Sequence, residues 1–337
     1  MRQRNRQAIA VLVSVVLFLF AFLTGCGQAK KEDQEKETKS TQFKPLDTKI
    51  NRIVAEYPGG RISEGDLNRY LNILAFLDMQ VSMMLSDPGM KKQLNDFKRI
   101  ILKGYAAELV IAKEVKREDE FRKRALKEIQ QLEKSLKENP LLGGPKVPKN
   151  LDEALKGKGF TRKDLEEFIV RSLQRNEYFK SQLKSLKYDK VKANHILIAY
   201  QLDAEGKKKR SDAEAKKRAE EVKKKLEQNG DFKKLAKEYS DDPGSKNNGG
   251  VIEGSADQFV PEFASAVRTL PLNKISDPIK TEYGYHIVKV TERSKEDYEK
   301  ASEEIKQQKM QQLNQEYIDK KLKVKILLPE EKAKKKK

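Results

Sequence analysis

The chain has 337 residues, enough for two compact domains with tails, of which 37% are hydrophobic and 36% charged. This balance favours an elongated, largely helical protein over a compact α/β enzyme. The formal net charge of +19 is spread over segments of mixed sign, so it is attributed to solubility and no nucleic-acid partner is expected. With one cysteine and two histidines, the sequence excludes an intrachain disulfide and has too few soft ligands for a zinc site.

The N-terminus has the pattern of a bacterial export signal. Arginines precede an apolar run from Ala8 to Leu23 that is broken only by Ser14. The run is shorter than the roughly 20 apolar residues that a spanning helix needs. It ends in Leu23-Thr24-Gly25-Cys26, which resembles the bacterial lipobox, in which the cysteine is acylated and becomes the new N-terminus. We therefore expect a signal peptide at 1–25 and a lipidated Cys26, with an uncleaved signal anchor as the alternative.

Two polar segments flank the part of the chain that is expected to fold. Residues 26–47 contain Phe43 and Leu46 as their sizeable apolar side chains and cannot bury enough surface to fold. They are predicted to form a flexible tether. The lysine-rich residues 329–337 are predicted to be a disordered, solvated tail.

The first folded segment is predicted to contain a short strand and two helical stretches. Residues 50–56 are rich in Ile and Val and precede a Pro-Gly-Gly turn, which predicts a strand. Ser63 and Asp66 have the spacing of a capping box, and apolar residues then recur at helical spacing. Asp87-Pro88-Gly89 is expected to end this helix, and a single long helical stretch is expected over 90–138.

A further helix is expected after an irregular connection that contains prolines. Thr161 and Asp164 resemble another helix start. The apolar residues that follow are expected to point toward a core and are Leu165, Phe168, Ile169 and Leu173. This part of the chain is therefore predicted to be mostly helical.

From about residue 191 the chain alternates between strands and helices. Strands are predicted at 191–200, which contains His195, and at 285–291, which contains His286. Between them lie two helices, a Gly/Asn/Asp-rich loop and a short helix, at 212–228, 231–238, 241–250 and 259–270. This β-α-α-loop-α-β order over about 100 residues predicts a compact module.

Helical sequence of similar composition lies before and after this module. A long amphipathic helix is predicted from about 294 to 322, followed by a short strand near 324–327. The simplest topology is an insertion, in which the first and last thirds of the chain pack together. We therefore predict an α+β fold, with a β-sheet/helix module inserted in a mostly helical domain built from N- and C-terminal segments.

Four segments of the module carry a family pattern, in order: Asn194-His195-Ile196-Leu197-Ile198; Phe232-Lys233-Lys234-Leu235-Ala236; Tyr239-Ser240-Asp241-Asp242 with Gly249-Gly250; and Thr281-Glu282-Tyr283-Gly284-Tyr285-His286-Ile287. In sequence and spacing they resemble parvulin-type peptidyl-prolyl isomerases over residues 189–293. Together with the lipobox, the flanking helices and Gly60-Arg61-Ile62-Ser63, the chain is similar to the extracytoplasmic foldases of the PrsA type. The resemblance implies a parvulin module in a chaperone domain and no cofactor.

Isomerisation of an X-Pro bond needs no covalent step, because the barrier of about 20 kcal/mol comes from the resonance of the planar amide. A catalyst must hold the proline ring in an apolar slot, exclude water and favour the twisted amide. The resemblance assigns Val251, Phe259 and Phe263 to the proline pocket and Tyr283 and Thr281 to its rim. Phe259 and Phe263 are four residues apart in the predicted helix, so their rings should share a face, and core packing is the alternative.

The resemblance also implies a catalytic centre of His195, Asp242 and His286. A hydrogen-bond network among them would tune the field around the bound carbonyl group. Alternatively, the two histidines simply connect two strands. Asp242 could alternatively be an ordinary turn residue, since aspartate is common in turns before a residue such as Pro243.

The sequence departs from the family pattern after the loop. Many relatives have Gly-Asp-Leu-Gly followed by an aromatic residue, where this chain has Gly250-Val251-Ile252-Glu253-Gly254. Val260 stands where glutamine is frequent. These changes would widen the pocket or weaken the activity. The basic segment Lys207–Arg210 is either a solvated loop or a site that prefers an acidic or phosphorylated residue before proline.

The expected domains are a signal peptide, a lipidated tether, an N-terminal helical part, the isomerase module, a C-terminal helix and a tail, at 1–25, 26–47, 48–188, 189–293, 294–328 and 329–337. We expect a foldase with prolyl isomerase activity at the outer face of the cytoplasmic membrane. Its substrates would be unfolded secreted chains with X-Pro bonds. A holdase with a weakly active module and a membrane-surface polybasic adaptor are the alternatives. Homodimer formation is left open.

Overall fold

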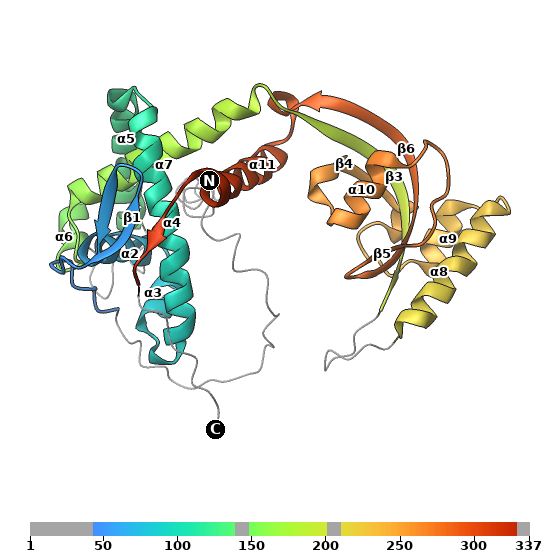
Figure 1. Cartoon of the computed structure of the whole chain (residues 1–337), viewed down its shortest axis with the longest axis horizontal. Coiled ribbons are helices and arrows are strands. Elements are labelled where there is room, and N and C mark those ends of the chain that lie inside the picture. Colours follow the sequence, from blue (N-terminus) through green and yellow to red (C-terminus); the bar gives the residue numbers. More distant parts are fainter. Residues whose placement is uncertain (1–42, 139–147, 201–209, 329–337) are drawn as a thin grey trace. The chain divides into compact units, whose positions relative to one another are not determined.

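The computed structural model in Figure 1 describes residues 43–138, 148–200 and 210–328. These residues divide into two units. The helical unit belongs to Met1–Phe179 with Gln311–Lys337, and the inserted unit is Lys180–Met310. Cys26, the tail and most of the basic segment 207–210 lie outside the described residues.

A small antiparallel sheet joins the two ends of the helical unit. Strand β1 (Ile53–Tyr57) pairs with β2 (Gly60–Ser63) on one side and with β7 (Lys325–Ile326) on the other. The expected strands at 50–56 and near 324–327 are therefore present, and β2 is an addition. Because β7 returns to β1, the inserted unit interrupts a single helical unit, as the predicted fold class requires (Figure 1).

The first predicted helix is two helices. The Ser63–Asp66 capping box is confirmed at the start of α2 (Glu64–Leu77), where the Asp66 N–H donates to the Ser63 hydroxyl at 3.1 Å. The expected continuation to Asp87 is wrong, because α2 ends before Asp78 and α3 (Met79–Ser86) begins after it. The Asp78 carboxylate accepts the N–H groups of the first turn of α3, and this competes with a continuous helix.

The predicted helix over 90–138 is also two helices. A short 3₁₀ turn (Pro88–Met90) precedes α4 (Lys91–Glu114), and α5 (Glu118–Glu138) follows after a break. At the break, Arg117 has a positive φ of 82°, which no helix interior accepts. Three acidic residues in the first turn of α5 favour a new N-terminus there through the helix dipole.

The remaining helices of this unit are α6 and α7. The short α6 (Leu151–Leu155) lies where only an irregular connection was expected. The predicted helix start at Thr161 is confirmed, because α7 (Arg162–Leu183) follows it and the Asp164 N–H donates to the Thr161 hydroxyl at 3.2 Å. The apolar face of α7 is buried as expected: Leu165, Phe168, Ile169 and Leu173.

The inserted unit is built on a four-stranded antiparallel sheet in the order β4-β3-β6-β5. Its long central strands, β3 (Lys187–Ala199) and β6 (Gly284–Asp297), contain the two predicted strands. The edge strands β4 (Val251–Ser255) and β5 (Ile279–Thr281) were not predicted. Both edges are short, and such strands have weak sequence signals because pairing with the central strands stabilises them.

Helices cover both faces of this sheet. Helices α8 (Asp212–Glu227) and α9 (Phe232–Tyr239) lie on one face, and α10 (Pro261–Thr269) lies on the other (Figure 1). One core cluster contains Ile196 and Ile287 with residues of α8 and α9, and a second contains Ala193 and Val288 with residues of α10. Alternation along each strand therefore puts His195 and His286 on the α10 face.

The segment after the module differs from the prediction. The expected helix start at 294 is wrong, since β6 stays paired with β3 as far as Asp297. A 3₁₀ turn (Tyr298–Lys300) and α11 (Glu303–Glu316) follow, and α11 continues into a π-helical turn (Tyr317–Lys321). Within the described ranges, each helix is too short or too polar to cross a membrane.

Candidate active site

Two buried histidines face each other on the central strands of the inserted unit. His195 is 7% exposed and His286 is 6% exposed. Their rings stack at a centroid distance of 5.7 Å and an interplanar angle of 17°. The two Nδ1 atoms are 3.4 Å apart. Since β3 and β6 pair in antiparallel register here, the sheet itself fixes this contact.

The loop after α9 brings a carboxylate to the outer edge of His195. Asp242 Oδ2 lies 3.0 Å from His195 Nε2, and the Asp242 side chain keeps 25% of its surface exposed. The Gly244 N–H donates to the other oxygen of the same carboxylate at 3.1 Å. The structure thus brings together the three residues predicted for the catalytic centre, and their catalytic role stays a prediction.

Ser245 completes this contact and was missed from the sequence. Its hydroxyl lies 2.9 Å from His195 Nε2 and donates a hydrogen bond to Asp242. Ser245 is buried, with 3% of the residue exposed. A usable sequence signal was the serine three residues after an aspartate in a Gly/Asn-rich turn, where short polar side chains often bond locally.

Thr281 supports the second histidine from the opposite side. Its hydroxyl lies 2.9 Å from His286 Nε2 and accepts the Tyr283 N–H at 3.2 Å. Thr281 is 5% exposed, so it is a buried partner of His286 and not a residue of an open rim. Tyr283 is 57% exposed in the turn between β5 and β6, which agrees with a rim position.

The contacts favour one direction of hydrogen bonding along this chain of groups. An ionised Asp242 can only accept, so His195 donates from Nε2 and its Nδ1 is an acceptor. His286 then donates from Nδ1 to His195, and its Nε2 accepts the Thr281 hydroxyl proton. Both histidines are therefore neutral, His195 as the Nε2–H tautomer and His286 as the Nδ1–H tautomer.

The electrostatics of the site agree with this assignment. Burial lowers the pKa of His195, against the opposing effect of Asp242. Burial and the neighbouring His195 lower the pKa of His286 to about 3. Burial would raise the pKa of Asp242, but hydrogen bonds from Ser245 and Gly244 outweigh it and lower the pKa below its usual value. Near neutral pH the site contains one carboxylate and two uncharged imidazoles.

An aromatic wall lies against the histidine pair. Phe263 is 3% exposed, and its ring centroid lies 5.6 Å from that of His195 and 5.1 Å from that of His286. Phe259 contacts Phe263 at 5.1 Å and is half-buried. The prediction that both rings lie on one helix is wrong, because Phe259 precedes α10 and Pro261 is its first residue. Half-buried Val251 begins β4, paired with Asn194 beside His195.

The loop that carries Asp242 is held tightly against β3. The His195 N–H donates to the Gly250 carbonyl at 2.8 Å, and the Asp241 carboxylate accepts the Ala199 N–H at 2.9 Å. Arg210 pairs with Asp241 at 2.6 Å and donates to the Ala199 carbonyl at 2.7 Å. Arg210 therefore stabilises the loop, which weakens the expectation that it selects a phosphorylated residue before proline.

The residue types at this site also occur in hydrolases, but the geometry excludes a Ser-His-Asp relay. In such a triad, serine and carboxylate contact opposite nitrogens of the imidazole. Here Ser245 and Asp242 both contact Nε2 of His195. Across the residues that the structure describes, His, Cys, Asp and Glu form no group of three or more suited to a metal ion. The arrangement can bind and polarise, but it does not provide an activated nucleophile.

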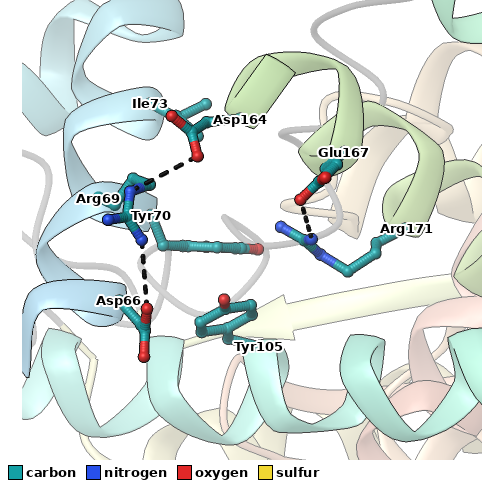
Figure 2. Close-up of a pocket in the computed structure, with 8 residues that line it drawn as sticks. All are labelled: Asp66, Arg69, Tyr70, Ile73, Tyr105, Asp164, Glu167 and Arg171. Carbon is teal, nitrogen blue, oxygen red and sulfur yellow. Dashed lines mark hydrogen bonds and ion pairs between the residues drawn. The ribbon is translucent and has the colours of Figure 1, made fainter. Parts of the chain in front are cut away.

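The helical unit has its own polar cleft, shown in Figure 2, between α2, α4 and α7. Arg69 bridges Asp66 at 3.2 Å and Asp164 at 3.5 Å, and Arg171 lies 3.8 Å from Glu167. The lining is completed by Tyr70, Ile73 and Tyr105. Because its charges are paired and the Arg69–Asp164 pair joins α2 to α7, we interpret this cleft as a structural contact.

Comparison with known proteins gives the same picture of the inserted unit. Residues 173–294 match the family model of the PPIC-type PPIASE domain. The foldase protein PrsA of Geobacillus kaustophilus is 38% identical over 136 residues, which are 40% of this chain and 41% of that relative. The match thus spans about two fifths of that protein's length. The foldase protein PrsA of Clostridium botulinum (strain Hall) is 28% identical over 316 residues, covering 83% of this chain and 87% of the relative.

Among solved structures, the crystal structure of peptidylprolyl isomerase (PrsA) from Bacillus anthracis is 27% identical. The alignment covers 65% of this chain and 89% of that chain, with a TM-score of 0.38. The resemblance inferred from the four sequence segments is therefore confirmed by the family model and the curated relatives. This chain carries a parvulin-type, PPIC-class prolyl isomerase domain and is a relative of the PrsA foldases.

Proposed function

We propose that this chain is a peptidyl-prolyl cis-trans isomerase that assists the folding of exported proteins. The observation that carries the proposal is the histidine pair with Asp242 at one end and Phe263 against its rings. It puts a charged group, a water-poor surface and an aromatic wall within one small site. Those are the features that catalysis of amide rotation requires.

The proline ring would bind against the aromatic wall. Phe259 and Phe263 present adjoining ring faces, and Phe259 is the more exposed of the two. A proline ring bound there would bring its amide close to His195, whose ring contacts Phe263. It would also bring the amide close to Asp242, which contacts His195. Val251 and Tyr283 would extend the surface at its margins.

Asp242 would supply the electrostatic part of the catalysis. A planar amide carries partial negative charge on its oxygen, and this charge falls when rotation breaks the resonance. A fixed carboxylate near that oxygen raises the free energy of the planar state more than that of the twisted state, and so lowers the barrier. Neutral His195 would hold Asp242 by donating from Nε2, and His286 would hold His195 by donating to its Nδ1. His195, Asp242 and His286 are thus proposed as the catalytic centre.

The N-terminal pattern supports a location for this activity. We propose that Cys26 is lipidated and anchors the protein at the outer face of the cytoplasmic membrane. Clients would be unfolded secreted chains with X-Pro bonds, and the helical unit would contact them as a chaperone domain. The oligomeric state, including a homodimer, is to be measured on the mature chain.

The test is isomerisation of a short X-Pro peptide by the mature chain and by Asp242→Ala. We expect activity in the wild type and a fall in kcat/KM of about 10²-fold in the variant, because a preorganised charge is lost. Asp277→Ala is the matched control, since Asp277 is an exposed aspartate of the same unit that pairs with Lys223. An inactive wild type that still prevents client aggregation would replace the isomerase by the holdase alternative.

Phe259→Ala separates binding from chemistry at the same site. We expect KM to rise several-fold with a smaller change in kcat, because the half-buried ring contributes apolar contact more than electrostatic stabilisation. Steady-state kinetics on the same peptide measure both constants. An unchanged KM would remove Phe259 from the proposed proline pocket.

A further inference from the structure

We propose that Ser245 is a positioning residue for the isomerase reaction, whose hydroxyl holds the Asp242 carboxylate and the Nε2 edge of His195 in one fixed arrangement. The inference rests on the proposed function and extends it to a residue outside the predicted catalytic centre. Ser245 lies 2.9 Å from His195 Nε2 and donates to the same carboxylate oxygen that His195 contacts. Ser245, His195 and Asp242 therefore all contact one another at the same carboxylate oxygen.

The backbone of the loop delivers this hydroxyl to a defined place. The N–H groups of Asn248 and Gly250 both donate to the Ser245 carbonyl, at 2.8 and 2.9 Å. Gly250 in turn receives the His195 N–H on its own carbonyl at 2.8 Å. Ser245 is thus connected through backbone hydrogen bonds to the strand that carries His195. These bonds hold the Ser245 backbone, and its buried hydroxyl reaches both His195 and Asp242.

The site needs this constraint because Asp242 is only partly enclosed. A quarter of its side chain is exposed, and one edge of the carboxylate is held by the Gly244 N–H alone. Without Ser245, the other oxygen would depend on His195 Nε2 as its remaining donor. The carboxylate could then rotate toward solvent, and His195 could lose its Nε2 proton to water and take one up at Nδ1, while His286 makes the converse change from Nδ1 to Nε2. Ser245 therefore fixes both the position of the charge and the direction of the proton chain.

The hydroxyl also favours the ionised form of Asp242. A donor to a carboxylate stabilises its charged form, so loss of the Ser245 hydroxyl is expected to move the pKa of Asp242 upward. The acid limb of the kcat/KM profile should then shift to higher pH. A residue that served only packing would lower the stability of the unit but would not move this limb.

The experiment compares Ser245→Ala with Ser276→Ala in the full mature chain. Ser276 is 2% exposed in the same unit and accepts the Val288 N–H at 2.9 Å, so both variants remove one buried hydroxyl. For Ser245→Ala we expect kcat to fall about tenfold with little change in KM. This is less than the roughly 10²-fold cost of removing a donor that acts directly on the reacting group. Ser276→Ala should leave kcat and the acid limb unchanged.

Imidazole ¹⁵N spectra give a readout that does not depend on activity. The chain has two histidines, so each ring can be assigned by substitution of the other. We expect one tautomer per ring in the wild type and mixed or exchange-broadened signals in Ser245→Ala. Ser245→Thr, which keeps a hydroxyl, should recover the single tautomers. If Ser245→Ala does not fold, Ser245→Cys, a weaker donor of similar size, replaces it in both measurements.

Two results would overturn the proposal. One is a Ser245→Ala protein whose kcat and acid limb equal those of the wild type. The other is a pair of histidine spectra that do not change with the substitution. Failure of the proposed isomerase function would be recognised separately, as an inactive wild type whose histidine signals still respond to Ser245→Ala.

Discussion

The two units each bury a carboxylate against a hydrogen-bonding partner, and they do so in opposite ways. In the helical unit, Glu108 is fully buried, pairs with Arg175 at 2.9 Å and accepts the Tyr70 hydroxyl at 3.1 Å. Burial raises the pKa of Glu108, against the opposing effect of Arg175. In the inserted unit, Asp242 keeps a quarter of its surface exposed, and the pKa is lowered because hydrogen bonds outweigh burial.

This difference separates a structural charge from one that can act on a ligand. Glu108 and Arg175 neutralise each other where no substrate can reach, since their side chains are 0% and 4% exposed. Asp242 faces neutral histidines, so its negative charge is not cancelled inside the site. In the proposed function, a substrate bound at the exposed edge would meet an uncompensated carboxylate. The charge of Glu108 therefore serves the stability of the helical unit, whereas the charge of Asp242 stays available to interact with a ligand of the inserted unit.

The largest effect is expected for Glu108→Gln. The substitution removes the charge of Glu108 from its buried pair with Arg175, which should reduce the free energy of unfolding of the helical unit by about 3–5 kcal/mol. Urea unfolding of the mature chain measures the loss. Glu118→Gln is the control, because its pair with Arg122 is exposed and should contribute less than about 1 kcal/mol. Equal effects of the two substitutions would show that burial does not distinguish these pairs.

The next effect is expected for Gly250→Ala beside His195. Gly250 has a φ of +72°, and a Cβ there would lie 2.2 Å from the His195 carbonyl oxygen. Overpacking and backbone strain together should cost about 2–4 kcal/mol and displace the loop that carries Asp242. Gly157 in the helical unit has a φ of +73° with open space around it, so Gly157→Ala should cost only about 1 kcal/mol. Thermal unfolding and the peptide assay compare the two, and a harmless Gly250→Ala would contradict the tight contact.

Acid should destabilise the two units differently. Because the pKa of His286 is lowered from 6.5 to about 3, the unfolded chain takes up a proton below pH 6.5 that the folded site resists. Stability of the inserted unit is therefore present above pH 6.5 and lost as pH falls, by about 2 kcal/mol at pH 5. The raised pKa of Glu108 has the opposite sign, so the helical unit should not share this loss.

Unfolding followed by NMR signals from each unit, at pH 7.5 and pH 5, checks this expectation. His286→Gln should reduce the acid-induced loss in the inserted unit, whereas His195 keeps part of it because its pKa is lowered as well. A loss that appears equally in both units would contradict the assignment to the histidine pair.

Much of the fold was accessible from short stretches of sequence. Helix starts at Ser63 and Thr161 were predicted because a capping box involves residues only three positions apart. The breaks at Asp78 and Arg117 were not, because apolar periodicity continues on both sides of each break. Strands β4 and β5 were missed because their stability comes from pairing with β3 and β6.

The candidate site divides in a similar way. His195, Asp242 and His286 were assigned through resemblance, and the structure brings all three into contact. Phe259 was expected on the helix that carries Phe263, yet the two rings still meet because the chain turns at Pro261. Ser245 was not predicted because serine is common in polar turns. Its proposed role depends on its contact with His195, which only the folded chain creates.

Local sequence patterns are sufficient to predict the helix caps, the central strands and the residue types available for catalysis. It also predicts the export signal and Cys26, since such signals are linear patterns. The tautomers, the buried hydroxyl of Ser245 and the direction of the proton chain depend on the folded arrangement. His195 and His286 are 91 positions apart, and a one-residue change in the pairing of β3 with β6 would turn one of them to the other face.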